Sequence, residues 1–230
     1  MAKIFAAVTL LVIALTIASA NDTTAKVASF LQKKFATMLD RLHPVDHIEL
    51  PRLQVHLTSL SPLLTLFGAN IRLTHIRVMQ ILNHVEIDRP FTAVTKQSET
   101  LTRIKTRQIA TDIPVDAEIF FNVVGMMMPR NLTGTIKRLT MNVDYFFNKQ
   151  TDELKIVGVT APADWMSIEL KVDGPQRTGL VSIRSVLDNV ETQLRHALAR
   201  PIADLFRNVN REDLNGWRQD LVKLLKENPV

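Results

Sequence analysis

Two neighbouring segments decide the fold of this chain: residues 113–123, which read IPVDAEIFFNV, and residues 132–147, which read LTGTIKRLTMNVDYFF. In the first segment every odd position is apolar, and most positions between are polar. In the second, apolar residues and one glycine occupy even positions up to Ile136, and apolar residues occupy odd positions from Leu139. Alternation with a period of two predicts strands with one buried face. The change of parity near Lys137 predicts a β-bulge, which increases the curvature of a strand.

Shorter strand-like segments flank this pair on both sides. Apolar residues alternate over residues 53–57, and a strand-like pattern runs through residues 70–89. After a turn predicted at residues 148–152, further strands are expected around Leu154 and over residues 166–172. Because no repeat or linker interrupts this region, we expect one large antiparallel sheet.

Helical spacing appears at both ends of the strand region. Apolar residues recur every three or four positions over residues 23–42, and Pro44 is expected to end that helix. The same spacing begins at Ile183 and continues towards Lys226, with Pro201 expected to kink this helix rather than stop it. The predicted fold class is α+β: a highly curved antiparallel sheet wrapped around a long C-terminal amphipathic helix, with an N-terminal helix.

The N-terminal residues have the three parts of a secretory signal peptide. Lys3 gives a basic start, residues 4–17 are almost entirely apolar, and residues 18–20 (ASA) match a cleavage site. The apolar run is shorter than the roughly 20 residues that a membrane-spanning helix needs. We expect residues 1–20 to be removed, residues 21–230 to form a single domain, and the mature protein to be secreted and extracellular.

Two triplets match the acceptor pattern for N-glycosylation. They begin at Asn21 and Asn131, and neither has proline in its middle position. Asn131 follows Pro129 closely, which predicts an exposed turn there. The sequence therefore predicts a glycoprotein, with Asn131 the better candidate because Asn21 would lie at the new terminus.

Composition excludes several classes of protein. The chain has 230 residues, 46% of them hydrophobic and 22% charged, which is typical of a globular domain. It contains no cysteine, and so has no disulfide, zinc–thiolate site, iron–sulfur cluster or cysteine nucleophile. The formal net charge is +5, but no basic run with interleaved aromatic residues is present. We therefore expect no nucleic-acid partner.

The common catalytic and metal-binding motifs are missing from the sequence. It has no G-x-S-x-G, no H-E-x-x-H and no phosphate-binding loop ending in lysine. His43 and His47 are four residues apart, but Pro44 between them disrupts the helix that would align their rings. We predict that the protein is not an enzyme, and that it has no catalytic residue, metal site or cofactor.

One short segment carries alternating basic residues. Arg103, Lys105 and Arg107 are expected on the same face of a strand. This pattern is typical of a solvated basic face, and it also suits a site for anionic bacterial or membrane surfaces. Screening by salt would weaken contacts of the second kind.

The order of these elements is similar to that of the tubular lipid-binding (TULIP) superfamily. The resemblance is carried by residues 69–89, 112–125 and 132–173 and by the helix from Val181. It implies a curved sheet wrapped around a helix, with an apolar tunnel between them. Because the chain has no cysteine, it lacks the disulfide of the juvenile-hormone-binding, takeout and permeability-increasing branches. Its layout is most similar to single-domain members such as the mite group 7 allergens.

The resemblance implies a secreted, non-enzymatic carrier whose partner is a lipid or another hydrophobic small molecule. Inward-facing positions of the strands and the helix are the candidate ligand-lining residues. They are Ile119, Phe121, Val123, Met126, Met141, Val143, Tyr145, Leu187 and Leu194. The methionines at 126–128 are more typical of a strand end packed in the core, and they also suit a ligand-lining surface. A structural glycoprotein with a filled core is the third alternative. The sequence indicates neither the ligand nor the oligomeric state.

Overall fold

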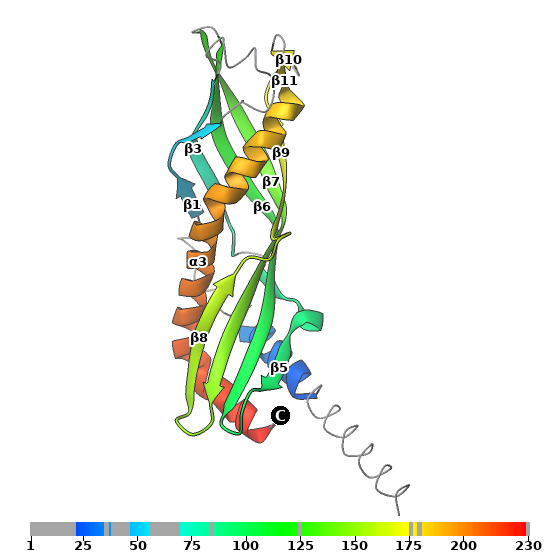
Figure 1. Cartoon of the computed structure of the whole chain (residues 1–230), viewed down its shortest axis with the longest axis vertical. Coiled ribbons are helices and arrows are strands. Elements are labelled where there is room, and N and C mark those ends of the chain that lie inside the picture. Colours follow the sequence, from blue (N-terminus) through cyan, green and yellow to red (C-terminus); the bar gives the residue numbers. More distant parts are fainter. Residues whose placement is uncertain are drawn as a thin grey trace, which may run out of the picture.

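The computed structural model describes residues 22–34, 37, 47–55, 70–82, 85–123, 126–174, 177–178 and 181–228. Within these residues a nine-stranded antiparallel sheet curves around α3 (Ile183–Glu227), a 45-residue helix that runs along the length of the molecule (Figure 1). A second helix covers residues 22–34. The α+β fold class predicted above is confirmed. The expected signal peptide and the glycosylation candidate Asn21 lie outside the described residues.

The sheet is organised around two long strands that form a hairpin. These are β6 (Leu101–Val123) and β7 (Met126–Asn148), each 23 residues long and paired from one end to the other. The other strands are β1 (His47–Leu50), β2 (Leu53–Val55), β3 (Asn70–Met79), β4 (Val85–Ile87), β5 (Ala93–Lys96), β8 (Glu153–Thr160) and β9 (Met166–Val172). A 3₁₀ turn, η1 (Arg89–Phe91), precedes β5, and β10 (Arg177–Thr178) pairs with β11 (Val181–Ser182) in a separate ribbon.

The shorter strands pair with successive parts of the long hairpin. On the free edge of β6, residues 115–122 pair with β3, residues 108–110 with β4 and residues 102–105 with β5. On the free edge of β7, β9 pairs with residues 132–139 and β8 with residues 142–148. Figure 1 shows β3 and β9 at the level of the N-terminal half of α3, and β5 and β8 at the level of its C-terminal half.

The predicted bulge in the second segment is confirmed by the pairing of β7 with β9. Ile136 is opposite Ile168, whereas Arg138 is opposite Ser167, so that Lys137 is one extra residue on β7. An extra residue moves every later side chain to the other face of the sheet. It thereby keeps Leu139 and the residues after it directed towards α3.

The partner strand β6 changes parity at the same level. Its buried side chains fall at even positions over residues 102–110 and at odd positions over residues 113–121. Between them, Asp112 has a φ of 52°, in the left-handed region. The amine of Lys137 lies 3.4 Å from a carboxylate oxygen of Asp112. The inward-facing positions thus change parity at the same level in both long strands, and the hairpin keeps one continuous inner face along its whole length.

The predicted helical stripe of α3 faces this inner surface. Val190, Leu194, Leu198 and Ile202 have no exposed surface. The helix continues through Pro201, as expected, because a proline removes one backbone donor but leaves the rest of the helix bonded. None of the helices that the structure describes is long and apolar enough to cross a membrane.

The helix at residues 22–34 joins the C-terminal end of α3 to the sheet. The ring of Phe30 meets the edge of Trp217 at a centroid distance of 5.8 Å. The amine of Lys34 lies 2.8 Å from a carboxylate oxygen of Asp220. This hydrogen bond and the charge of Lys34 lower the pKa of Asp220 below its ordinary value. Further hydrogen bonds run from Thr23 Oγ1 to the carbonyl of Asn228 and from the amide of Ile87 to Gln32 Oε1.

Candidate functional site

The predicted ligand-lining residues converge on the space between the sheet and α3. Those that are buried there are Ile119, Phe121, Met141, Val143, Tyr145 and Leu194. Leu187 is half-buried and packs against the same core. The side chains of Val123 and Met126 lie outside the described part of the structure. The sequence-based assignment of these residues to one inner face is confirmed for the described members, and their contact with a ligand stays a prediction.

This interior is long and closed. At about 1.5 Å per residue, the 45 residues of α3 extend over roughly 65 Å, and the inner face of the hairpin follows them. Ile119, Met141, Val143 and Tyr145 are each 0% exposed, so protein atoms surround them. A ligand between the sheet and α3 must therefore displace side chains or separate the two layers.

A polar cluster lies inside this apolar interior. Asn210 on α3 accepts hydrogen bonds at its Oδ1 from the hydroxyl of Tyr145 and from Gln108 Nε2, the latter at 2.9 Å. Its Nδ2 donates to Gln108 Oε1 at 3.2 Å and to the carbonyl of Phe206 at 2.6 Å. Gln108, Tyr145 and Asn210 have no exposed surface.

The polar cluster was not predicted from the sequence, although one signal pointed to half of it. The even positions of residues 102–110 face inward, and Gln108 is one of them. Following the alternation of residues 113–123 towards the N-terminus, with the change of parity taken into account, would have placed Gln108 on the buried face. Asn210 follows the apolar stripe of the helix by one residue and carries no comparable signal.

The predicted basic residues lie together on the outer face of β6. Arg103, Lys105 and Arg107 alternate with the inward-facing residues, and Lys105 is exposed. An exposed neighbour of this basic face, Thr95, belongs to β5 and is opposite Arg103. The structure thus confirms that the three residues share one face, whereas its role stays a prediction.

Two of these basic side chains are held by neighbours. Arg103 lies 2.5 Å from a carboxylate oxygen of Asp144 on β7, so much of its charge is balanced locally. The guanidinium of Arg107 stacks on the ring of Phe91 at 3.6 Å from its centroid. Phe91 is 53% exposed. The outer face therefore combines an exposed lysine with an exposed aromatic ring.

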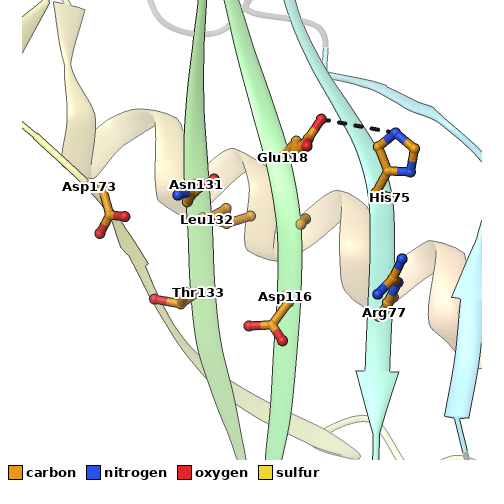
Figure 2. Close-up of a pocket in the computed structure, with 9 residues that line it drawn as sticks. His75, Arg77, Asp116, Glu118, Asn131, Leu132, Thr133 and Asp173 are labelled. Atoms are coloured by element: carbon orange, nitrogen blue, oxygen red, sulfur yellow. Dashed lines mark ion pairs between the residues drawn. The ribbon is translucent and has the colours of Figure 1, made fainter.

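A shallow depression of about 530 Å³ lies on the opposite half of the outer face (Figure 2). Its rim carries charges of both signs, and His75 Nε2 lies 4.0 Å from Glu118 Oε2. The lining residues are His75, Arg77, Asp116, Ala117, Glu118, Asn131, Leu132, Thr133 and Asp173. Within the described residues, no group of three histidine or acidic side chains is placed to hold a metal ion.

The turn predicted at Asn131 is wrong. Asn131 lies inside β7, opposite Glu118 on β6, and its side chain is exposed in the depression. Pro129 is compatible with the strand because β9 pairs with β7 only from Leu132 onward, leaving that edge of β7 without a partner from β9. Exposure leaves the acceptor triplet accessible, and glycosylation of Asn131 stays a prediction.

Comparisons with known proteins give a distant structural similarity for this chain. No family model matches it, and no curated protein matches it. Among solved structures, it is similar to a crystal structure of lipopolysaccharide binding protein, at 8% sequence identity and a TM-score of 0.46. The match covers 85% of this chain and 39% of that one, so the chain spans about two fifths of that structure's length. At this identity and TM-score, only the residues of the chain itself support a function.

Proposed function

We propose that this protein is a secreted, non-enzymatic carrier that binds a lipid or another long apolar molecule between its curved sheet and α3. One observation carries the proposal: the inner faces of β6 and β7 and the stripe of α3 form a single buried surface along the molecule, which is mostly apolar and is interrupted by the polar cluster around Asn210. Apolar burial contributes about 25 cal/mol per Å² before the costs of ordering. A long apolar molecule gains most from such an elongated surface.

Partly buried apolar side chains at the N-terminal half of α3 support the same proposal. Leu187 on α3 and Leu170 and Val172 on β9 pack against the core while keeping some exposed surface. Met128 on β7 does the same, and the neighbouring Met127 is 54% exposed. Flexible methionines adapt to apolar shapes of different kinds. This end of the interior is the place where an apolar chain is expected to enter.

The direct test is to purify the protein and record native mass spectra before and after organic extraction. A carrier is expected to show an adduct of lipid size that the extraction removes, and the extract identifies the class of cargo. If there is no adduct, the protein is offered fluorescent fatty acids and phospholipids. Failure to bind any of them would contradict the proposal.

Replacing Leu187 with tryptophan is expected to weaken uptake of a fluorescent fatty acid about tenfold, which corresponds to about 1.4 kcal/mol. The larger ring occupies space beside the apolar stripe, and the half-buried site tolerates it without unfolding. The measurement is a dissociation constant from fluorescence titration. Arg184→Trp, one turn earlier at an exposed position, is the control and should leave affinity unchanged. Equal affinities for both variants and the native protein would show that the ligand does not bind at this end of the interior.

The basic face supports a second candidate function, which is recognition of anionic membrane or bacterial surfaces. The supporting observation is that Lys105 is exposed between Arg103 and Arg107, with the ring of Phe91 beside them. An exposed aromatic ring next to cations suits the interface of a membrane.

Reversing the charges of Lys105 and Arg107 to glutamate is expected to weaken binding to vesicles of phosphatidylglycerol and phosphatidylcholine at least tenfold at low salt. Repulsion then replaces attraction, and 1 M salt should remove the difference because the screening length falls to about 3 Å. Co-sedimentation measures the bound fraction. Arg200→Glu on α3, whose side chain is 93% exposed, is the matched control. Unchanged binding after the double reversal would refute this second function.

A further inference from the structure

The interior contains a hydrogen-bond donor for which the described residues provide no acceptor. This donor is the indole Nε1 of Trp217 on α3, a residue that is 4% exposed; the nitrogen is buried and has no hydrogen-bond partner among residues 22–34, 47–55, 70–174 and 181–228 as far as these are described. An indole nitrogen can only donate, and buried donors in folded proteins almost always have an acceptor. Within the described part of the chain, this group is therefore placed to donate to an oxygen of a bound molecule.

The surroundings of Trp217 are aromatic. Its ring meets Phe30 and Tyr145 edge-on, at centroid distances of 5.8 Å and 6.4 Å. Tyr145 is one of the predicted ligand-lining residues, and its hydroxyl donates to Asn210. Asn210 lies two helical turns before Trp217, on the same side of α3. The unpartnered donor thus belongs to the same interior as the candidate lining residues.

A second buried group marks this half of the interior as polar. Thr102, on the inner face of β6, is 2% exposed, and no described residue forms a hydrogen bond with its Oγ1. Thr106 and Gln108 follow it on the same face, and both are buried. The inner face of β6 is therefore partly polar beside the C-terminal half of α3, whereas residues 113–121 place only apolar side chains inside.

We propose that the indole N–H of Trp217 binds the polar end of the apolar ligand, through a neutral oxygen such as a hydroxyl or an ester carbonyl. This inference rests on the proposed carrier function. An ionised carboxylate is disfavoured because aromatic rings do not replace its hydration. The cation beside Phe30, the amine of Lys34, is already paired with Asp220 at 2.8 Å. The hydrocarbon part of the ligand then extends along α3 towards Phe206 and Ile202, which lie about 16 and 22 Å from Trp217 along the helix.

Nuclear magnetic resonance of the native protein tests the contact directly. The chain has two tryptophans, so ¹⁵N labelling gives two indole signals, and Trp165→Phe assigns them. The probes are 1-dodecanol, methyl dodecanoate, dodecanoic acid and dodecane, which differ at one end only. The alcohol and the ester are expected to shift the Trp217 indole proton downfield, and dodecane is expected to bind without that shift. The Trp165 signal is the internal reference.

Affinities of the Trp217→Phe variant provide the second test. Loss of one neutral hydrogen bond is expected to weaken 1-dodecanol binding about threefold to tenfold and to leave dodecane binding unchanged. Trp165→Phe removes a similarly buried tryptophan and should change neither affinity. If the variant does not fold, the spectra of the native protein decide.

The outcomes separate this inference from the proposed function. If all four probes bind and the Trp217 indole signal does not move, the role of Trp217 is overturned and the carrier function stands. The same conclusion follows if Trp217→Phe weakens the binding of 1-dodecanol and of dodecane equally. A stronger shift with dodecanoic acid than with the alcohol overturns the preference for a neutral oxygen. Binding of no probe at all overturns both.

Discussion

Replacing Asn210 with alanine is expected to lower the free energy of unfolding by about 3–5 kcal/mol, the largest effect of any single substitution considered for this protein. Asn210 makes four hydrogen bonds in an interior where no water reaches its side chain. Its removal leaves both the amide nitrogen and the amide oxygen of Gln108 without this partner. Tyr145 loses an acceptor for its hydroxyl at the same time.

The size of the effect follows from burial rather than from the number of bonds alone. A buried polar group that loses its partner lowers the free energy of unfolding by about 1–3 kcal/mol, because its hydrogen bonds to water are lost on folding and no bond within the protein replaces them. Gln108 and Asn210 are separated by 102 positions in the chain, so they also join the middle of β6 to α3. The change is measured by urea denaturation followed by circular dichroism.

Two comparisons make this prediction specific to the polar cluster. Asn208→Ala, on the exposed side of the same helix, should change stability by less than about 0.5 kcal/mol. Gln108→Ala combined with Asn210→Ala should lose less than the sum of the single losses, since the second change removes groups already left unpaired. A small loss for Asn210→Ala, or strict additivity in the double variant, would show that the cluster contributes little.

Replacing Gly134 with alanine is expected to lower the free energy of unfolding by about 2–4 kcal/mol. Gly134 on β7 is opposite Leu170 on β9. A Cβ atom there would lie 2.6 Å from Leu170 Cδ2 and 2.7 Å from the backbone oxygen of Glu169. The leucine side chain can rotate away, but the backbone oxygen moves only if β9 shifts from β7.

The strand β8 provides the matched control. A Cβ atom added to Gly158 meets nothing within 4 Å, so Gly158→Ala should leave stability unchanged or raise it by a few tenths of a kcal/mol. Both variants are compared by thermal unfolding, where the Gly134 variant should melt several degrees lower. Equal melting temperatures for the two variants would mean that β9 adjusts to the methyl group without loss.

Local patterns in the sequence determined the elements of this fold. The alternation in residues 113–123 and 132–147 gave the second half of β6 and most of β7 with their buried faces, and the shift near Lys137 gave the bulge. The spacing after Ile183 gave α3 and most of its buried stripe. These features are readable because alternation and helical spacing depend only on which side of one element meets the core.

Pairings between distant segments were decided only by the tertiary structure. The contacts of Asn210 with Gln108, and of Trp217 with Phe30, depend on how α3 is rotated and shifted against the sheet and the first helix. The position of Asn131 inside β7 depends on the partner strand, since its local sequence favours a turn. Many registers between two segments satisfy the same alternation, and packing of the whole core selects one of them. The register is therefore not encoded in any local pattern.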